Sequence, residues 1–182
     1  MDENDLQIED ILEEKSVKKK VNAKKKGNRV ELELCKFLTK LFGKEFSRSV
    51  GSGNRWSQVH HMPEHAKKTL VGDICAPENF LWVIECKGGY EKEIDLNGIF
   101  DGNARLDAFM QQSENDQGQS GRQPIICWKR SRKPWLAMVK QEHLPIRGKK
   151  WFDTMIQYKG WWIMKLDDLL EITDEKYWFR DE

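Results

Sequence analysis

The stretch from Val71 to Lys87 constrains the fold of this chain more than any other. It reads Val-Gly-Asp-Ile-Cys, then breaks at Pro77-Glu78-Asn79, and continues as a short apolar run that ends in Glu85-Cys86-Lys87. A nearly continuous apolar run of this length predicts a strand that is buried on both faces. Because side chains alternate along a strand, Glu85 and Lys87 should share one face.

Asp73 is expected to lie close to Glu85. Pro77 and Asn79 are turn residues, so the segment Ile74-Cys75 can fold back beside the apolar strand. Two carboxylates and a lysine would then meet at the edge of an apolar sheet, a set that suits Mg²⁺ or Mn²⁺ and a phosphate. The alternative is an acid in a turn and a surface Glu–Lys pair. The apolar run favours a functional cluster, because burying unpaired charge is costly.

The segment 27–42 has the pattern of an amphipathic helix, and two of its acids differ in position. Glu31 falls near the middle of the apolar face, whereas Glu33 falls almost opposite, with the solvent-facing residues. An acid on an apolar face needs a partner, for which a metal or a lysine would serve. The apolar residues of this face are Leu34, Cys35, Leu38, Leu41 and Phe42.

These motifs together resemble a known family. Gly72-Asp73 followed by Ile84-Glu85-Cys86-Lys87 resembles the PD-(D/E)xK nuclease signature, with Gly72 in place of the proline. Upstream, Lys26-Gly27-x-x-x-Glu31 and then Arg48-Ser49-Val50-Gly51-Ser52 resemble the pattern of archaeal Holliday junction resolvases. The chain departs from that pattern at Leu32, where the family often has Arg. The resemblance implies an α/β fold with a restriction-endonuclease-like core, in which helices flank a mixed central β-sheet.

The resemblance also implies catalytic roles. Glu31, Asp73 and Glu85 would hold Mg²⁺, for which Mn²⁺ can substitute, and the backbone carbonyl of Cys86 would complete the metal site. Lys87 would orient the attacking water and offset charge in the transition state. The catalytic set implied in this way is Glu31, Asp73, Glu85 and Lys87.

A second group of residues is expected to contact DNA. Arg48 and Ser52 match resolvase positions near the scissile phosphate, and Gln112 matches a glutamine that related nucleases often place on the helix after this strand. Basic residues of the N-terminal segment and of the turn at 129–134 would add phosphate contacts. The expected DNA-binding residues are Arg48, Ser52, Lys24, Lys25, Lys26, Arg55, Gln112, Lys129 and Arg130.

The charge distribution suggests three regions. The formal net charge is only +1, but residues 15–48 hold twelve Lys and Arg against three Glu, and residues 166–182 hold seven Asp and Glu against two Lys and Arg. We expect a charged N-terminal arm at 1–26, a nuclease domain at 27–172 and an acidic C-terminal tail at 173–182. A lysine-rich arm can neutralise phosphates regardless of sequence, although a solubilising tail or a targeting signal has the same composition.

The remaining pattern predicts further elements. Three of the four histidines lie in 55–70, where a loop that touches DNA is favoured over a zinc site because Pro63 interrupts any aligning helix. Residues 90–103 are expected to be a loop and 113–123 a connection. Strands are expected at 45–49, 124–128, 135–140 and 161–165, and helices at 104–113 and 166–171.

The resemblance thus implies a metal-dependent DNA endonuclease that is structure-selective for branched DNA and acts as a homodimer. The alternatives are a restriction- or repair-type nuclease of the same superfamily and a non-catalytic DNA-binding module. Four cysteines without a CxxC pair suggest buried free thiols in a reducing compartment. With neither a membrane-spanning run nor a signal peptide, we expect a cytoplasmic protein of a prokaryotic or phage-infected cell, without membrane contact or an organic cofactor.

Overall fold

The computed structural model describes residues 23–49, 69–144 and 155–181. These ranges contain both helices and strands, as the sequence predicts. In chain order they are α2 (Ala23–Phe42), β1 (Ser47–Arg48), β2 (Ile74–Cys75), β3 (Trp82–Gly88), α5 (Leu96–Asp101), α6 (Ala104–Ser120), β4 (Gln123–Lys129), β5 (Trp135–Lys140), the 3₁₀ helix η1 (Gln141–His143), β6 (Ile156–Tyr158), β7 (Trp161–Lys165), α7 (Leu166–Ile172) and α8 (Glu175–Trp178).

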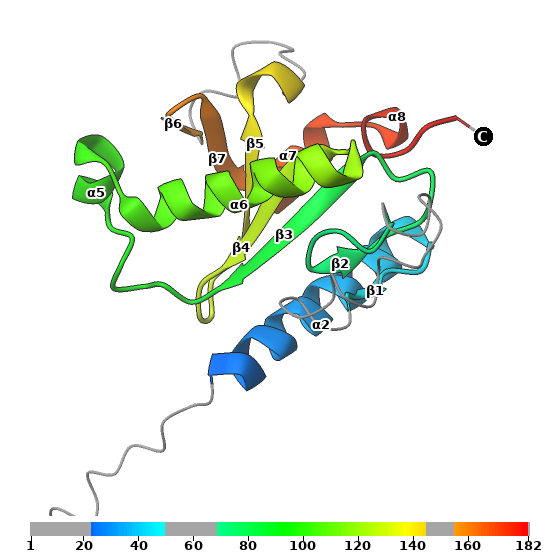
Figure 1. The fold of residues 1–182 in the computed structure, drawn as a ribbon, viewed down its shortest axis with the longest axis horizontal. Helices are drawn as coiled ribbons and strands as arrows, with labels where there is room; N and C mark the ends of the chain where they lie inside the picture. Colours follow the sequence, from blue (N-terminus) through cyan, green and yellow to red (C-terminus); the bar gives the residue numbers. More distant parts are fainter. Residues whose placement is uncertain (1–22, 50–68, 145–154, 182) are drawn as a thin grey trace, which may run out of the picture.

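The centre of the molecule is a five-stranded sheet with the strand order β3-β4-β5-β7-β6. β3 and β4 run parallel, joined by a connection that contains α6, and the other neighbours in this sheet are antiparallel. β3 therefore forms one edge of the sheet among the described strands. The short strands β1 and β2 pair antiparallel with each other beside α2 (Figure 1).

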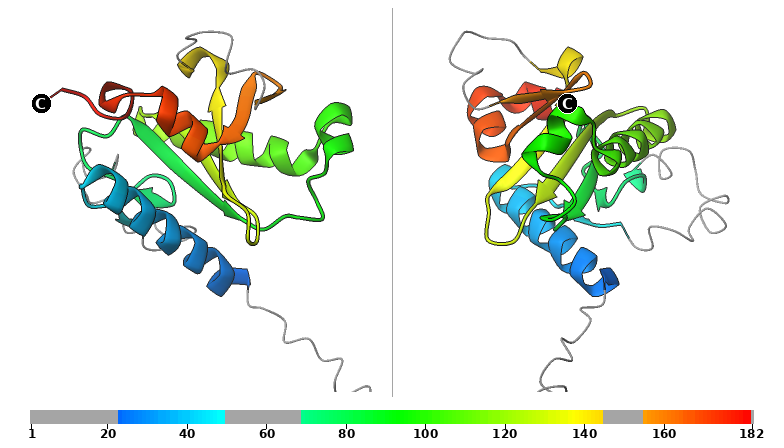
Figure 2. Two further views of the ribbon diagram at one scale, coloured as in Figure 1. Left: turned by 180° about the vertical axis from the view of Figure 1, so that it is seen from behind. Right: turned by 90° about the vertical axis from the view of Figure 1, so that its left-hand side faces the viewer.

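Helices cover both faces of this sheet, as the views from behind and from the side show (Figure 2). On one face, α2 and α8 pack against β3, along which the buried side chains of Trp82, Ile84 and Cys86 alternate, and α7 packs against β5 and β7. On the other face, Leu106 and Phe109 of α6 pack against β4 and β5. The expected mixed sheet flanked by helices is confirmed. None of the described helices has both the length and the apolar character needed to cross a membrane.

The region between β3 and β4 differs from the prediction in two ways. The segment expected to be a loop contains α5, and the helix expected to stop at residue 113 continues to Ser120. The side chain of Asn103 caps its N-terminus by accepting from the N–H groups of Arg105 and Leu106, and Gly121 ends it in the left-handed conformation, with φ of 69°. Its last turns bury small polar side chains, which carry no hydrophobic signal.

Both ends of the expected nuclease domain were placed too far inward. α2 begins at Ala23, so residues 23–26 belong to the helix and not to the arm, of which residues 1–22 lie outside the described ranges. At the other end, Trp178 and Phe179 are buried against Phe80, with ring centroids 6.2 and 5.2 Å from it. Their aromatic area makes Trp178 and Phe179 part of the core, not of a solvated acidic tail.

The apolar face of α2 was predicted correctly except at one residue. Leu34, Cys35 and Leu38 are buried, and Phe42 packs in an aromatic cluster with Phe46. Leu41, which was expected on this face, is 45% exposed. This face of α2 packs along β3. Residues in the N-terminal half of α2 therefore lie near the end of β3 that carries Glu85 and Lys87 (Figure 1).

Candidate active site

Asp73 lies just before β2 and is fixed to β3 by two hydrogen bonds. Its backbone N–H donates to the carbonyl of Ile84 at 3.0 Å, and its Oδ2 accepts from the backbone N–H of Cys86 at 2.9 Å. The residue is 7% exposed, and its negative charge acts directly on Glu85. The predicted approach of Asp73 to Glu85 is confirmed, although the ladder partner of β2 is β1 and not β3.

Gly72 has a structural reason to replace the proline of the PD signature. Its φ is +83°, and a Cβ added here would lie 2.8 Å from the carbonyl oxygen of Ile84 and 2.9 Å from Cγ2 of Val83. Proline has φ fixed near −65° and cannot adopt this conformation. The chain passes so close to β3 at this point that only glycine fits, and this close approach positions Asp73.

Glu85 and Lys87 share the face of β3 that is turned toward α6. Lys87 Nζ donates to Oε1 of Glu85 and, at 2.8 Å, to Oε1 of Gln112 on α6, and it lies 5.2 Å from the centre of the Phe109 ring. Glu85 is only 1% exposed. Burial, with the neighbouring Asp73 carboxylate, raises the pKa of Glu85 to about 9 although Lys87 acts in the opposite direction.

One oxygen of Glu85 is buried without a partner. Oε2 has no hydrogen-bond donor within the ranges that the structure describes. The carboxyl of Asp116 on α6 lies within hydrogen-bonding reach of the Glu85 carboxyl, but two carboxyl groups can bond to each other only while one of them carries a proton. Burial, reinforced by the charge of Asp73, raises the pKa of Asp116. An unpaired buried carboxylate oxygen is costly unless a proton or a cation satisfies it.

The sequence analysis missed Asp116 because it placed the end of the helix too early. Asp116 follows Gln112 by four residues, so the two side chains lie on the same face of α6. A helix continued to either of the next two glycines, Gly118 or Gly121, would have included Asp116 and indicated this alignment. Gln112 itself was expected to contact DNA, and the structure places it against Lys87.

Glu31 on α2 has a different partner from those expected. Its Oε2 accepts from Nε of Arg48 at 2.7 Å, and a terminal nitrogen of Arg48 donates to Oδ1 of Asn28 at 2.8 Å. The Glu31 side chain is 12% exposed, whereas Glu33 is 48% exposed, which confirms that the two acids differ as the helical pattern predicts. The side chain that pairs with Glu31 is an arginine and not a lysine. Glu31 and Arg48, predicted to act separately, therefore form one unit.

The donor set of this site fits a hard divalent cation bound by few protein ligands. Within the described residues, no three Asp, Glu, His or Cys side chains converge closely enough to hold a metal ion among them. Mg²⁺ is commonly bound by one or two carboxylates and retains several waters. Asp73 and Glu85 provide two carboxylates, and the unpartnered Oε2 of Glu85 is an oxygen that a cation would satisfy. The residues present are thus compatible with Mg²⁺.

Comparison with known proteins identifies the chain. The family model described as "Phage putative PDDEXK endonuclease" matches residues 22–178. The chain belongs to this family. It is therefore a nuclease, the resemblance seen at Gly72-Asp73 and Ile84–Lys87 is confirmed, and the sheet with its flanking helices is the restriction-endonuclease-like core.

Outside the family model, this PDDEXK endonuclease shows weak similarity to a solved structure. No curated protein matches the chain. A solved structure of Hjc, a Holliday junction resolvase from the archaeal hyperthermophile Archaeoglobus fulgidus, is 15% identical to it with a TM-score of 0.39. That similarity covers 84% of this chain and 95% of the resolvase chain.

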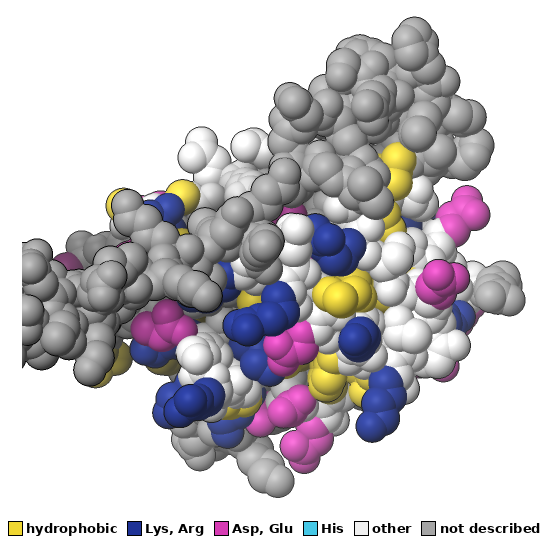
Figure 3. Space-filling view, turned by 90° about the horizontal axis from the view of Figure 1, so that it is seen from below, with side chains coloured by type: hydrophobic (Ala, Val, Ile, Leu, Met, Phe, Trp, Pro, Cys, Tyr) yellow, Lys and Arg dark blue, Asp and Glu magenta, His cyan; other side chains and the backbone are white. Residues whose placement is uncertain are grey.

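The basic residues expected to bind DNA lie among acids in this endonuclease. Lys129 forms an ion pair with Glu33, and the guanidinium of Arg130 donates to the backbone carbonyl of Glu91 at 3.5 Å. Viewed from below, Lys and Arg side chains alternate with Asp and Glu side chains (Figure 3). Of the other expected contacts, Lys26 lies beside Gly89 and Glu91. Ser52 and Arg55 lie outside the described residues, and of Lys24 and Lys25 the structure describes only their place in α2.

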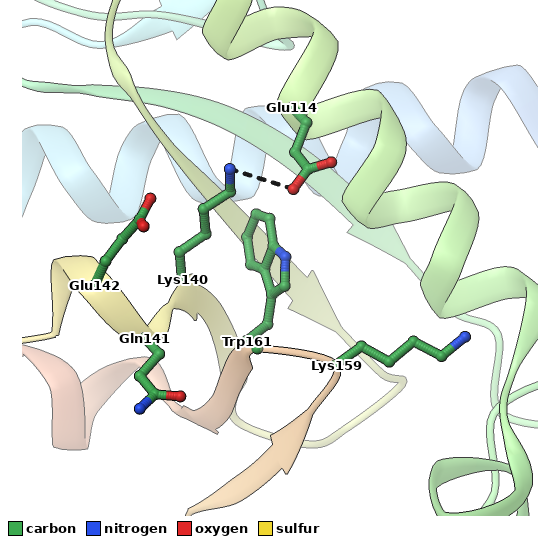
Figure 4. Close-up of a pocket in the computed structure, with 7 residues that line it drawn as sticks. Glu114, Lys140, Gln141, Glu142, Lys159 and Trp161 are labelled. Atoms are coloured by element: carbon green, nitrogen blue, oxygen red, sulfur yellow. Dashed lines mark ion pairs between the residues drawn. The ribbon is translucent and has the colours of Figure 1, made fainter.

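A polar pocket of about 440 Å³ lies apart from these residues, between α6 and the ends of β5 and β7 (Figure 4). Its central cation, Lys140, pairs with Glu114 at 3.2 Å and donates to Gln117 at 3.0 Å. Lys140 also lies 5.8 Å from the centre of the Trp161 ring. Lys140 thus already has its partners within the protein. The residues that line this pocket therefore serve to hold α6 against the sheet.

Proposed function

We propose that this nuclease hydrolyses DNA phosphodiester bonds with Mg²⁺, for which Mn²⁺ can substitute. The observation that carries the proposal is the buried pair Asp73 and Glu85 beside Lys87, with one Glu85 oxygen lacking a partner in the described part of the chain. Such a group is costly to bury and gains its compensation from a bound cation. A merely structural Glu–Lys pair would have been expected to satisfy both oxygens.

Asp73 and Glu85 would hold the cation, with the carbonyl of Cys86 as a further oxygen donor. When bound, the cation would polarise a phosphoryl oxygen and lower the pKa of a bound water. The protein's own part is to hold the two carboxylates rigidly, by the hydrogen bond from Cys86 N–H to Asp73 and by the bond from Lys87 to Glu85. These fixed groups need no reorganisation during the reaction.

Lys87 would stabilise negative charge on the phosphate and orient the attacking water. Its ammonium group has three donor hydrogens, and Glu85 and Gln112 occupy two of them. The third donor remains for a substrate oxygen. Gln112 therefore acts as a positioning residue for Lys87, in place of the direct DNA contact first expected of it.

Glu31 and Arg48 would act together at the side of the site nearest α2. Glu31 lies close enough to Cys86 for its charge to act on that residue, so it can still contribute to the cation site when Arg48 turns to a phosphate. In the structure, the bond from Arg48 to Glu31 balances the two charges. DNA would then have to compete with Glu31 for Arg48, which makes phosphate binding and cation binding mutually supportive.

Branched DNA is the proposed substrate and a homodimer the proposed active form. The support is the ordered resemblance of Lys26-Gly27-x-x-x-Glu31 and Arg48 through Ser52 to the resolvase pattern. Two symmetric cuts across a four-way junction need two active sites, which a homodimer provides. A restriction- or repair-type nuclease with the same site would instead cleave linear duplex or single-stranded DNA.

Cleavage of labelled four-way junction, flap, linear duplex and single-stranded DNA tests the proposal. The full-length protein is compared with Glu85→Gln and Lys87→Ala, and Glu33→Gln serves as a control that removes a surface acid. Paired nicks in the junction, dependent on Mg²⁺ and absent in the two site variants, are expected. Equal cleavage of all substrates would discard junction selectivity. Cleavage that persists in EDTA or in Glu85→Gln would refute the cation site.

A further inference from the structure

The face of α6 that is turned toward β3 carries two polar side chains that meet the acid and the lysine of the site. Gln112 and Asp116 are one helical turn apart and therefore project in the same direction. Gln112 contacts Lys87, and Asp116 reaches the carboxyl of Glu85. One helix face thus contacts both polar residues of the β3 motif.

The charges at this position are not balanced by the protein. The groups that act on Asp116 are the carboxyls of Glu85 and Asp73 and the ammonium of Lys87. The groups that act on Glu85 are the carboxyls of Asp73 and Asp116 and the same ammonium. Three carboxylates therefore face one ammonium group. The nearby Arg48 is engaged by Glu31. A bound divalent cation would supply the positive charge that three acids beside one ammonium group lack.

The geometry around Glu85 is a second, independent indication of a cation at this position. Glu85 is 1% exposed, and its Oε2 is without a hydrogen-bond donor from any residue whose placement is described. Another acid of α6 shows what a structural carboxylate looks like in this protein. Asp107 accepts from the hydroxyl of Tyr158 at 2.9 Å and from Lys159 at 2.8 Å. Asp116 is placed instead beside a second acid.

We propose that Asp116 helps to bind the divalent cation of the site, as a carboxylate that lies beside Glu85 and supplies the charge needed there. The inference rests on the proposed function, because it concerns the same cation. Asp116 is a positioning residue in this role, acting through Glu85 and the water shell of a hard cation. It lies outside the sequence motifs that resemble the nuclease signature, which end at Lys87.

Calorimetric titration of the full-length protein with Mn²⁺ in the absence of DNA tests the inference. Asp116→Asn should weaken Mn²⁺ binding by about 10- to 100-fold, the usual effect of removing a group that supports a metal ligand. Glu114→Gln is the matched control, because it removes one negative charge from the same helix at a 48% exposed side chain that pairs with Lys140. The control should retain Mn²⁺ affinity within about twofold, as expected for a distant screened charge.

Thermal unfolding without a cation separates this role from a structural one. The amide of Asp116→Asn can donate to the unpaired oxygen of Glu85, so its melting temperature should equal or exceed that of the wild type. A lower melting temperature without cation would overturn the inference, because it would show that Asp116 stabilises the fold. Unchanged Mn²⁺ affinity, or an equal loss in Glu114→Gln, would overturn it as well.

Glu85→Gln distinguishes failure of this inference from failure of the proposed function. Loss of Mn²⁺ binding in Glu85→Gln with normal binding in Asp116→Asn would remove Asp116 and leave the proposed cation site intact. No Mn²⁺ binding by the wild-type protein would refute the proposed function and the inference together. Loss of binding in both variants, with the control unaffected, supports both.

Discussion

Restoring the family's proline at position 72 should damage this protein rather than improve it. Gly72 has φ of +83°, and its Cα faces the carbonyl oxygen of Ile84 so closely that a Cβ would lie 2.8 Å from that atom. For Gly72→Ala, the left-handed backbone costs about 1–2 kcal/mol. The overpacking against β3 adds about 1–3 kcal/mol. The expected loss in the free energy of unfolding is therefore about 2–5 kcal/mol.

Gly72→Pro should be worse, because its ring locks φ near −65° and forces the chain to leave β3. Asp73 would then lose its bonds to the Ile84 carbonyl and the Cys86 N–H, each contributing about 1 kcal/mol. Cleavage should fall with stability, because Asp73 is displaced.

Urea unfolding followed by circular dichroism measures these losses. Gly118→Ala is the control, because Gly118 lies within α6, has no positive φ and has no atom within 4 Å of an added Cβ. This substitution should increase the free energy of unfolding by about 0.5–1 kcal/mol. A Gly72→Pro protein as stable and active as the wild type would refute the reasoning on Gly72.

Three further predictions follow from the burial of charged groups and thiols. Without divalent cations, the free energy of unfolding should fall as the pH rises from about 4.5 to about 9, because folded Glu85 keeps a proton that the unfolded chain releases. Glu85→Gln should remove this part of the pH dependence. An identical pH dependence in both proteins would contradict the prediction. Arg48→Ala should lower the free energy of unfolding by about 1–3 kcal/mol, because it leaves the Glu31 carboxylate unpaired. The double variant Arg48→Ala with Glu31→Gln should recover part of this loss. Additive losses of the two substitutions in denaturant titrations would exclude the coupling. Iodoacetamide at pH 8 should modify Cys75 before Cys127, because Cys75 is half-buried while burial raises the pKa of Cys127 to about 12. Peptide mass spectrometry that shows the reverse order would contradict the burial of Cys127 and of β4, which carries it, in the core.

The sequence was sufficient to predict the part of the site that depends on strand alternation and on a single turn. Glu85 and Lys87 share a face because they are two apart on a strand, and Asp73 reaches them because Pro77 and Asn79 reverse the chain. Glu31 stood out because an acid interrupted an apolar helical face. Each of these inferences needed only a local period, which the structure preserves.

The missed features depend on contacts that no local period reveals. The last turns of α6 have small polar residues toward the sheet, so the apolar pattern ended before the helix did, and Asp116 was lost with them. α8 carries acids among its aromatic residues, and only the distant Phe80 shows that Trp178 and Phe179 belong to the core. The pairing of Glu31 with Arg48 was likewise not predicted, because Arg48 reaches Glu31 from another element.

Exposure along the site gives the direction from which a substrate phosphate would approach. Glu85 is 1% exposed, the Lys87 side chain 13%, and the bond from Lys87 to Gln112 lies at the surface. Under the proposed function, a phosphate would meet Lys87 directly and would reach Glu85 only through a bound ion or water. The deep burial of Glu85 would then strengthen the action of its charge on the cation, because the surrounding medium has a low dielectric constant, while Lys87 would contact the substrate. Under the proposed function, substitution of Lys87 should affect DNA binding as well as cleavage, whereas substitution of Glu85 should affect cleavage through the loss of the cation.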